Sequence, residues 1–124
     1  MTEVQFQQFK NLKKTLEMNI PQVMAALVRA QNNFDCVSYA IFFSETALIV
    51  DKSNTYRGRK EIENWIVAAN EQYKTVMKPL SYKKGETESI LKAVVSGNFT
   101  GSPVVLFYHV RIVNEQVQSL KITG

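Results

Sequence analysis

Asp51 is the residue whose position points most directly to chemistry. It ends the apolar run Ala47 to Val50, which is rich in β-branched residues and is typical of a strand covered on both faces. Burial beside Leu, Ile and aromatic neighbours disfavours the charged form of an acid, which suits a group that exchanges a proton near neutral pH. The alternative is a turn-capping carboxylate, because Ser53-Asn54 follows.

Tyr108 is the second candidate, because of the face on which it falls. In the strand predicted over 103–113, alternate side chains point to opposite faces of a sheet. One face consists of Val104, Leu106, Tyr108, Val110 and Ile112 and looks like core, with Tyr108 its only polar member. A phenol in that position can donate a hydrogen bond to a developing oxyanion. The other face consists of Val105, Phe107, His109 and Arg111, apolar at one end and cationic at the other.

Cys36 is the only cysteine and His109 the only histidine of the chain. One cysteine excludes an internal disulfide and fits a reducing compartment. Its neighbours Phe34 and Val37 favour a small buried hydrophobe over a nucleophile, which needs a base or a positive environment. We therefore expect neither a metal site nor a cofactor.

Length and charge limit the classes of partner. The 124 residues fit one domain, with 45% hydrophobic and 21% charged residues. The net charge of +4 comes from scattered basic residues, so no nucleic-acid partner is predicted. No run approaches the ~20 apolar residues of a membrane helix, and charged residues interrupt the first nineteen positions. We expect a cytoplasmic protein without a membrane partner.

The elements that must position these residues follow from periodicity. Helices are predicted over Pro21 to Gln31, from an Asp35 N-cap through Phe43, and after Gly58. The last shows the strongest pattern, with Pro79 ending the run; its apolar positions are Ile62, Trp65, Ile66, Ala69, Tyr73 and Val76. Hairpin-connected strands are predicted over 80–84, 89–99, 104–113 and 117–122. Helices followed by an antiparallel sheet indicate an α+β domain.

The order of these elements resembles the SnoaL-like branch of the nuclear transport factor two-like superfamily, whose best-studied enzymes are ketosteroid isomerases. The resemblance covers roughly 21–122. It is carried by Ala47-Leu-Ile-Val-Asp51, by Tyr56-Arg-Gly-Arg59 with Ile62 and Trp65, and by Gly101-Ser-Pro-Val-Val-Leu. It implies a cone-shaped, curved antiparallel sheet wrapped around about three helices, with an apolar pocket opening at one end.

The same resemblance implies a domain division and an assembly. Residues 21–124 would form a single SnoaL-like domain, and residues 1–20 an N-terminal helical extension with an apolar stripe. Members of the superfamily commonly form homodimers through the outer face of the sheet. On that basis Phe107, His109 and Arg111 would lie at a subunit interface, and His109 would be structural rather than catalytic.

The resemblance also assigns site residues. The general base of ketosteroid isomerases stands at the strand end that Asp51 occupies, and the acid of their long strand falls on Tyr108. Their helical tyrosine falls on Leu27, which cannot donate a hydrogen bond. The predicted site is therefore Asp51 and Tyr108 as catalytic residues, with a ligand contacted by Leu27, Phe43, Tyr56 and Trp65.

Two functions remain open at this point. The first is a pocket protein for a small, largely apolar ligand, with proton transfer by Asp51 of the isomerase or cyclase type and no cofactor. The second is a non-catalytic ligand-binding or dimerisation module, favoured by the missing donor at Leu27. Tyr39, Tyr73 and Tyr82 could also line the cavity or simply belong to the core. An ion pair between Asp51 and Arg59 would argue against the base.

Overall fold

The computed structural model describes residues 19–124, so the predicted extension over residues 1–20 lies almost entirely outside the described residues. Two helices come first, α2 (Gln22–Asn32) and α3 (Cys36–Ile41). The hairpin β1 (Phe43–Asp51) and β2 (Asn54–Arg57) then leads into the long helix α4 (Gly58–Tyr73). Four strands complete the described fold: β3 (Val76–Lys83), β4 (Ser89–Ser96), β5 (Val104–Val113) and β6 (Gln116–Thr123).

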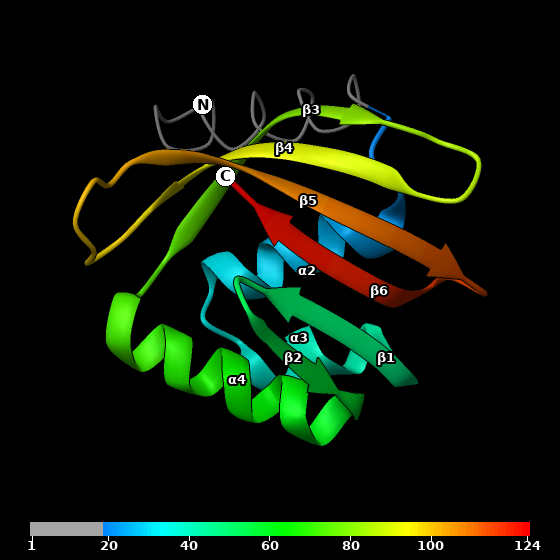
Figure 1. Ribbon diagram of the computed structural model, residues 1–124, viewed down its shortest axis with the longest axis horizontal. Coiled ribbons are helices and arrows are strands. Elements are labelled where there is room, and N and C mark those ends of the chain that lie inside the picture. Colours follow the sequence, from blue (N-terminus) through cyan, green and yellow to red (C-terminus); the bar gives the residue numbers. More distant parts are fainter. Residues whose placement is uncertain (1–18) are drawn as a thin grey trace, which may run out of the picture.

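The strands form one six-stranded sheet in the order β2-β1-β6-β5-β4-β3. All neighbours are antiparallel except β1 and β6, which run parallel, so the sheet is mixed rather than wholly antiparallel as predicted. The sheet is not closed, and α2, α3 and α4 pack on one face of it (Figure 1). The predicted α+β class, with about three helices against a curved sheet, is confirmed.

The first two helices form largely where the sequence predicts them. Pro21 precedes the first residue of α2, and the Asp35 side chain accepts a hydrogen bond from Ser38 N at 3.1 Å, which caps α3. The cap hydrogen bond lowers the pKa of the exposed Asp35 carboxyl. The predicted helix extends too far, because Phe43 begins strand β1. Hydrophobic spacing over so few residues does not distinguish the last turn of a helix from the start of a strand.

Helix α4 has a well-defined start. Gly58 has φ +80°, and an added Cβ would stand 3.3 Å from Glu45 O, so the position favours glycine on both counts. The Glu61 side chain accepts a hydrogen bond from Arg57 N at 3.0 Å, which satisfies one backbone donor at this end.

The end of α4 differs from the prediction. The helix stops at Tyr73, where Lys74 adopts a left-handed conformation with φ 48°. Val76 and Pro79 belong instead to β3, and the register shifts just after Pro79. Because β3 is an edge strand, the missing N–H of a proline is tolerated there.

Strand β5 shows the predicted alternation. Tyr108 and Val110 are buried on the face that packs against the helices, while Val105 and Arg111 are exposed on the other face. The buried side chains of the sheet and the helices make one hydrophobic core, which includes Met24, Phe43, Ile49, Ile62, Leu91 and Leu120.

Candidate functional site

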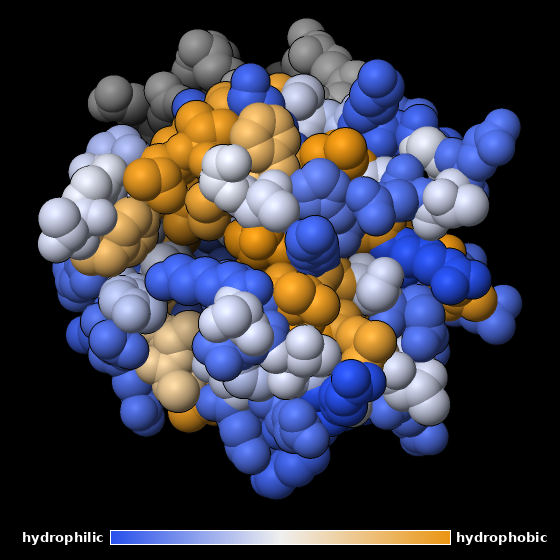
Figure 2. Space-filling view, in the orientation of Figure 1, coloured by the Kyte–Doolittle hydropathy of each residue, from blue (hydrophilic) through white to orange (hydrophobic). Residues whose placement is uncertain are grey.

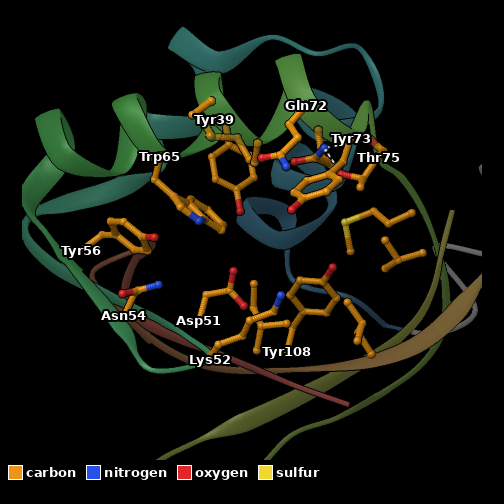
Figure 3. A pocket seen from close by; sticks show the side chains of 18 of the residues that line it. Tyr39, Asp51, Lys52, Asn54, Tyr56, Trp65, Gln72, Tyr73, Thr75 and Tyr108 are labelled. Carbon is orange, nitrogen blue, oxygen red and sulfur yellow. Dashed lines mark hydrogen bonds between the residues drawn. The ribbon is translucent and has the colours of Figure 1, made fainter. Parts of the chain in front are cut away.

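A cavity of about 680 Å³ lies between α4 and the helix-facing side of the sheet. Its floor comes from β1, β5 and β6, and its roof from α3 and α4 (Figure 3). The molecule is hollowed on the face seen in Figure 2, where apolar and hydrophilic residues meet. The volume is in the range of sites for small organic ligands.

Asp51, Ile122 and Tyr108 form one row across the floor. Asp51 on β1 is paired with Ile122 on β6, and Ile122 is paired in turn with Tyr108 on β5. Paired residues in adjacent strands point to the same face, and all three line the cavity. Two inter-strand spacings separate the Cα positions of Asp51 and Tyr108 by roughly 10 Å. A ligand lying on Ile122 would therefore have the carboxylate on one side and the phenol on the other.

The Asp51 carboxylate is half-buried and directed into the cavity. Within residues 19–124 it has no hydrogen bond or ion pair. The turn-capping alternative lacks the side-chain hydrogen bond that it requires. Arg59 binds elsewhere, since it donates to Phe43 O at 2.8 Å and pairs with Glu45 at 3.6 Å.

Tyr39 brings a second hydroxyl to the cavity, in addition to that of Tyr108. Figure 3 shows its hydroxyl pointing from α3 toward Asp51 across the cavity, with Tyr108 and Tyr73 to one side. Tyr39 and Tyr108 are buried residues, but their hydroxyls are accessible from the cavity and neither makes a hydrogen bond within the described part of the chain. Both hydroxyls are thus free to donate to a ligand.

Burial raises the pKa of Tyr108 well above the usual value for a phenol, and the Asp51 carboxylate adds to the effect. Burial likewise raises the pKa of Tyr39, with further contributions from Tyr108 and Asp51. Each phenol therefore keeps its proton throughout the physiological range, as a hydrogen-bond donor to an oxyanion must.

An aromatic wall holds Tyr39 in place. The rings of Tyr56 and Trp65 have centroids 5.6 Å apart, those of Trp65 and Tyr39 are 6.3 Å apart, and those of Tyr39 and Phe43 are 5.5 Å apart. Tyr56 and Trp65 line the cavity, as does Tyr73. The wall offers a ligand flat apolar surfaces for ring stacking.

Two of the predicted ligand contacts lie elsewhere. Phe43 is fully buried behind Tyr39, and Leu27 is buried in the core on α2; neither lines this cavity. Tyr82 packs against the core but also lies outside the cavity lining. Tyr39, from the next helix along the chain, lines the cavity, whereas Leu27 does not.

A buried polar network closes one end of the cavity. Gln31 Nε2 contacts Asn70 Oδ1 at 3.0 Å, Thr75 O at 2.8 Å and Thr75 Oγ1 at 3.0 Å. Asn32 and the backbone of Met77 exchange two hydrogen bonds, of 2.9 and 2.7 Å. These contacts join α2, α4 and β3. Sequence reasoning missed the network, because its members are far apart in the chain.

The remaining titratable candidates take part in local contacts. His109 Nδ1 lies 2.9 Å from Glu88 Oε1, and its Nε2 lies 3.0 Å from Thr123 Oγ1. Cys36 Sγ accepts a hydrogen bond from Asn70 Nδ2 at 3.3 Å. Over residues 19–124 there is no group of three or more His, Cys, Asp or Glu residues arranged to hold a metal ion. No helix in that range is long and apolar enough to cross a membrane.

Solved structures with the same architecture are numerous. A candidate polyketide cyclase of Sinorhizobium meliloti has 28% sequence identity and a TM-score of 0.81, and the match covers 86% of this chain and 97% of that one. A Catenulispora acidiphila protein with a ketosteroid isomerase-like fold, solved with trimethylamine, has 17% identity and a TM-score of 0.75, covering 84% and 85%.

A third structure is the epoxide hydrolase/cyclase-like enzyme SalBIII, which has a role in pyran ring formation in the polyether salinomycin. It has 13% identity and a TM-score of 0.71, covering 82% of this chain and 86% of that one. No protein-family model and no curated protein sequence matches the chain.

The fold and its neighbours define a class of small α+β pocket domains. The chain has the fold of nuclear transport factor two-like and ketosteroid isomerase-like proteins, so the fold that the resemblance implied is confirmed.

Proposed function

We propose that this protein binds a small, largely apolar ligand in the cavity and that Asp51 transfers a proton from a carbon next to a carbonyl group of that ligand. The observation that carries the proposal is that the Asp51 carboxylate and the two buried phenols, Tyr39 and Tyr108, line a single cavity without a hydrogen bond to any described residue. The candidate polyketide cyclase at 28% identity supports the same class of chemistry.

The proposed step uses only side chains of this chain. Asp51 accepts the proton as the C–H bond breaks, and the electron pair moves through the new C=C bond onto the carbonyl oxygen. Tyr39 and Tyr108 donate hydrogen bonds to that enolate oxygen, where the charge develops. The enolate then either takes the proton back at another carbon, as in an isomerase, or attacks a second carbonyl carbon of the same molecule, as in a cyclase. In the second case the attacked C=O becomes an alkoxide, which takes the proton from Asp51.

Hydrogen–deuterium exchange tests this step without knowledge of the product. Enolisable ketones and 1,3-diketones with an aromatic body would be incubated in D₂O, and loss of the proton beside the carbonyl followed by NMR. We expect exchange with the wild type and its loss in Asp51→Asn. The matched control is Glu61→Gln, which neutralises another carboxylate at the cavity while retaining an acceptor for Arg57 N. Equal exchange in wild type and Asp51→Asn would rule out the proposed base.

The second candidate is a binding module without catalysis. The aromatic wall of Tyr56, Trp65 and Tyr39 favours it, because ring stacking alone can hold a flat ligand. If such ligands bind but none exchanges its proton faster than in buffer, this function replaces the catalytic one.

We also propose a homodimer through the outer face of the sheet. Val105 is 41% exposed there, opposite Val94 on β4. On the same face, the centroid of the Phe107 ring lies 5.9 Å from Lys92 Nζ. His109 and Arg111 continue that face toward the end of β5. Sedimentation equilibrium is expected to show a dimer that Val105→Glu weakens; a monomer at all concentrations would contradict it.

A further inference from the structure

Lys52 is the only basic residue that lines the cavity within the described part of the chain. It directly follows Asp51 and occupies the first position of the two-residue turn between β1 and β2. Figure 3 shows its side chain beside Asp51, with its nitrogen on the side of Tyr108. Lys52 makes no ion pair with any described residue, so its ammonium group is available to a ligand.

The backbone at Lys52 does not explain why a lysine stands there. Its φ is +57°, a left-handed conformation that glycine adopts without steric cost and that L side chains adopt with strain. Glycine, asparagine and aspartate are the usual residues at such turn positions. The backbone conformation alone would favour one of these residues, so the explanation for a lysine must come from its side chain.

The charges around the cavity differ in how they are used. Glu61 at the rim already accepts the Arg57 N–H and serves the start of α4. Asp51 is half-buried on the floor, whereas Lys52 is exposed at the mouth. The side-chain amides of Asn54, Asn64 and Gln72 also line the mouth and are exposed. Among residues 19–124, the mouth thus presents one cation without an ion pair and several N–H donors, while the interior presents aromatic rings.

We infer that the ligand is amphipathic, with an apolar ring body in the cavity and an anionic group, such as a carboxylate, bound by Lys52 at the mouth. This inference rests on the proposed ligand cavity and specifies the class of molecule that enters it. It also gives Lys52 a role separate from proton transfer, because the anionic group fixes which end of the ligand lies over Asp51.

Two fluorescent probes with the same aromatic skeleton test the inference. 8-Anilinonaphthalene-1-sulfonate carries an anionic group, and N-phenyl-1-naphthylamine does not. Trp65 is the single tryptophan and lines the cavity, so quenching of its emission reports binding there. We expect the wild type to bind the sulfonate more tightly, and Lys52→Met to weaken sulfonate binding about three- to fivefold while leaving the neutral probe unchanged.

Three further variants make the comparison specific. Lys84→Met removes an exposed positive charge outside the cavity lining and should change neither affinity. Lys52→Arg should retain the preference for the sulfonate. Asp51→Asn should strengthen sulfonate binding, because it removes a like charge from the floor.

The outcomes separate the two proposals. If both probes bind and Lys52→Met affects their affinities equally or not at all, the inference of an anionic group on the ligand is wrong. The proposed ligand cavity would still stand. If neither probe quenches Trp65, the ligand cavity itself is contradicted and the inference fails with it.

Discussion

The two ends of one cavity use their polar side chains in opposite ways. At the closed end, Gln31, Asn70 and Thr75 satisfy one another and join three elements of the fold. At the centre, Asp51, Tyr39 and Tyr108 line the cavity, and none of their side chains makes a hydrogen bond or ion pair with another residue among 19–124. Every fully buried side-chain N or O atom of residues 19–124 is paired, which is a structural role, whereas the unpaired groups are accessible from the cavity and can bind a ligand.

The largest expected effect comes from removing the Asp51 carboxylate at the centre of the cavity. Asp51→Asn should reduce proton exchange on a responsive ketone by about 10²- to 10⁴-fold, because the amide cannot serve as the base. Its free energy of unfolding should stay within about 0.5 kcal/mol of the wild type, since no hydrogen bond is lost. Exchange kinetics and urea denaturation measure the two quantities. A large loss of stability would place Asp51 with the structural group instead.

The next largest effect is expected when the Gln31 hydrogen bonds at the closed end are removed. Gln31→Leu leaves Asn70 Oδ1 and the Thr75 oxygens without their donor, and we expect a loss of about 2–3 kcal/mol in the free energy of unfolding. Asn64→Leu is the control, because Asn64 is an exposed amide at the cavity mouth with no side-chain hydrogen bond to a described residue. Urea denaturation should show a large loss in the free energy of unfolding only for Gln31→Leu. Equal stabilities of the two variants would refute the distinction between structural and ligand-facing polar groups.

A smaller effect is expected from a single phenol. Tyr39→Phe should slow proton exchange about tenfold, because Tyr108 remains as a donor to the oxyanion, and should leave stability nearly unchanged. Tyr82→Phe, outside the cavity lining, serves as the matched control for exchange rates. If Tyr39→Phe exchanges at the wild-type rate, Tyr39 belongs to the core rather than to the site.

The smallest effect concerns alkaline pH. The folded protein raises the pKa of Tyr39 and Tyr108, so each contributes stability that is fully present below the ordinary phenol pKa of about 10 and is lost as pH rises above it. By about pH 10.5 the loss should be about 1 kcal/mol for each tyrosine. Urea denaturation from pH 8 to 10.5 should show this fall, and Tyr39→Phe should reduce it. If the stability of both the wild type and Tyr39→Phe does not change with pH, the raised pKa of the two tyrosines is contradicted.

Sequence alone identified the floor of the cavity better than its roof. Asp51 and Tyr108 follow from a strand end and from strand parity, because side-chain direction in a strand repeats every two residues. Tyr39 could not be distinguished from a core aromatic, since α3 has only six residues and its spacing suits either role. The position taken from the family's first helix fell on Leu27, which does not line the cavity, whereas Tyr39 on α3 does.

The predicted fold failed where contacts are distant in the chain. Periodicity locates strands but does not order them, so the parallel pair of β1 and β6 was not predicted. The apolar spacing of α4 happens to continue through Val76 into β3, and only the left-handed Lys74 shows where the helix ends. The Gln31 network has no local sequence signal, because its hydrogen bonds span 39 and 44 residues.

The central place of β6 also affects how the protein is made. A ribosome synthesises β6 after every other described strand, yet β6 lies between β1 and β5 in the sheet. Until it is added, the hairpin of β1 and β2 has no strand connecting it to β3, β4 and β5. Asp51 and Tyr108 lie on opposite sides of this late strand. The floor of the site therefore forms only after residues 116–123 have been synthesised, and a nascent chain that stops before residue 116 carries both residues without bringing them together.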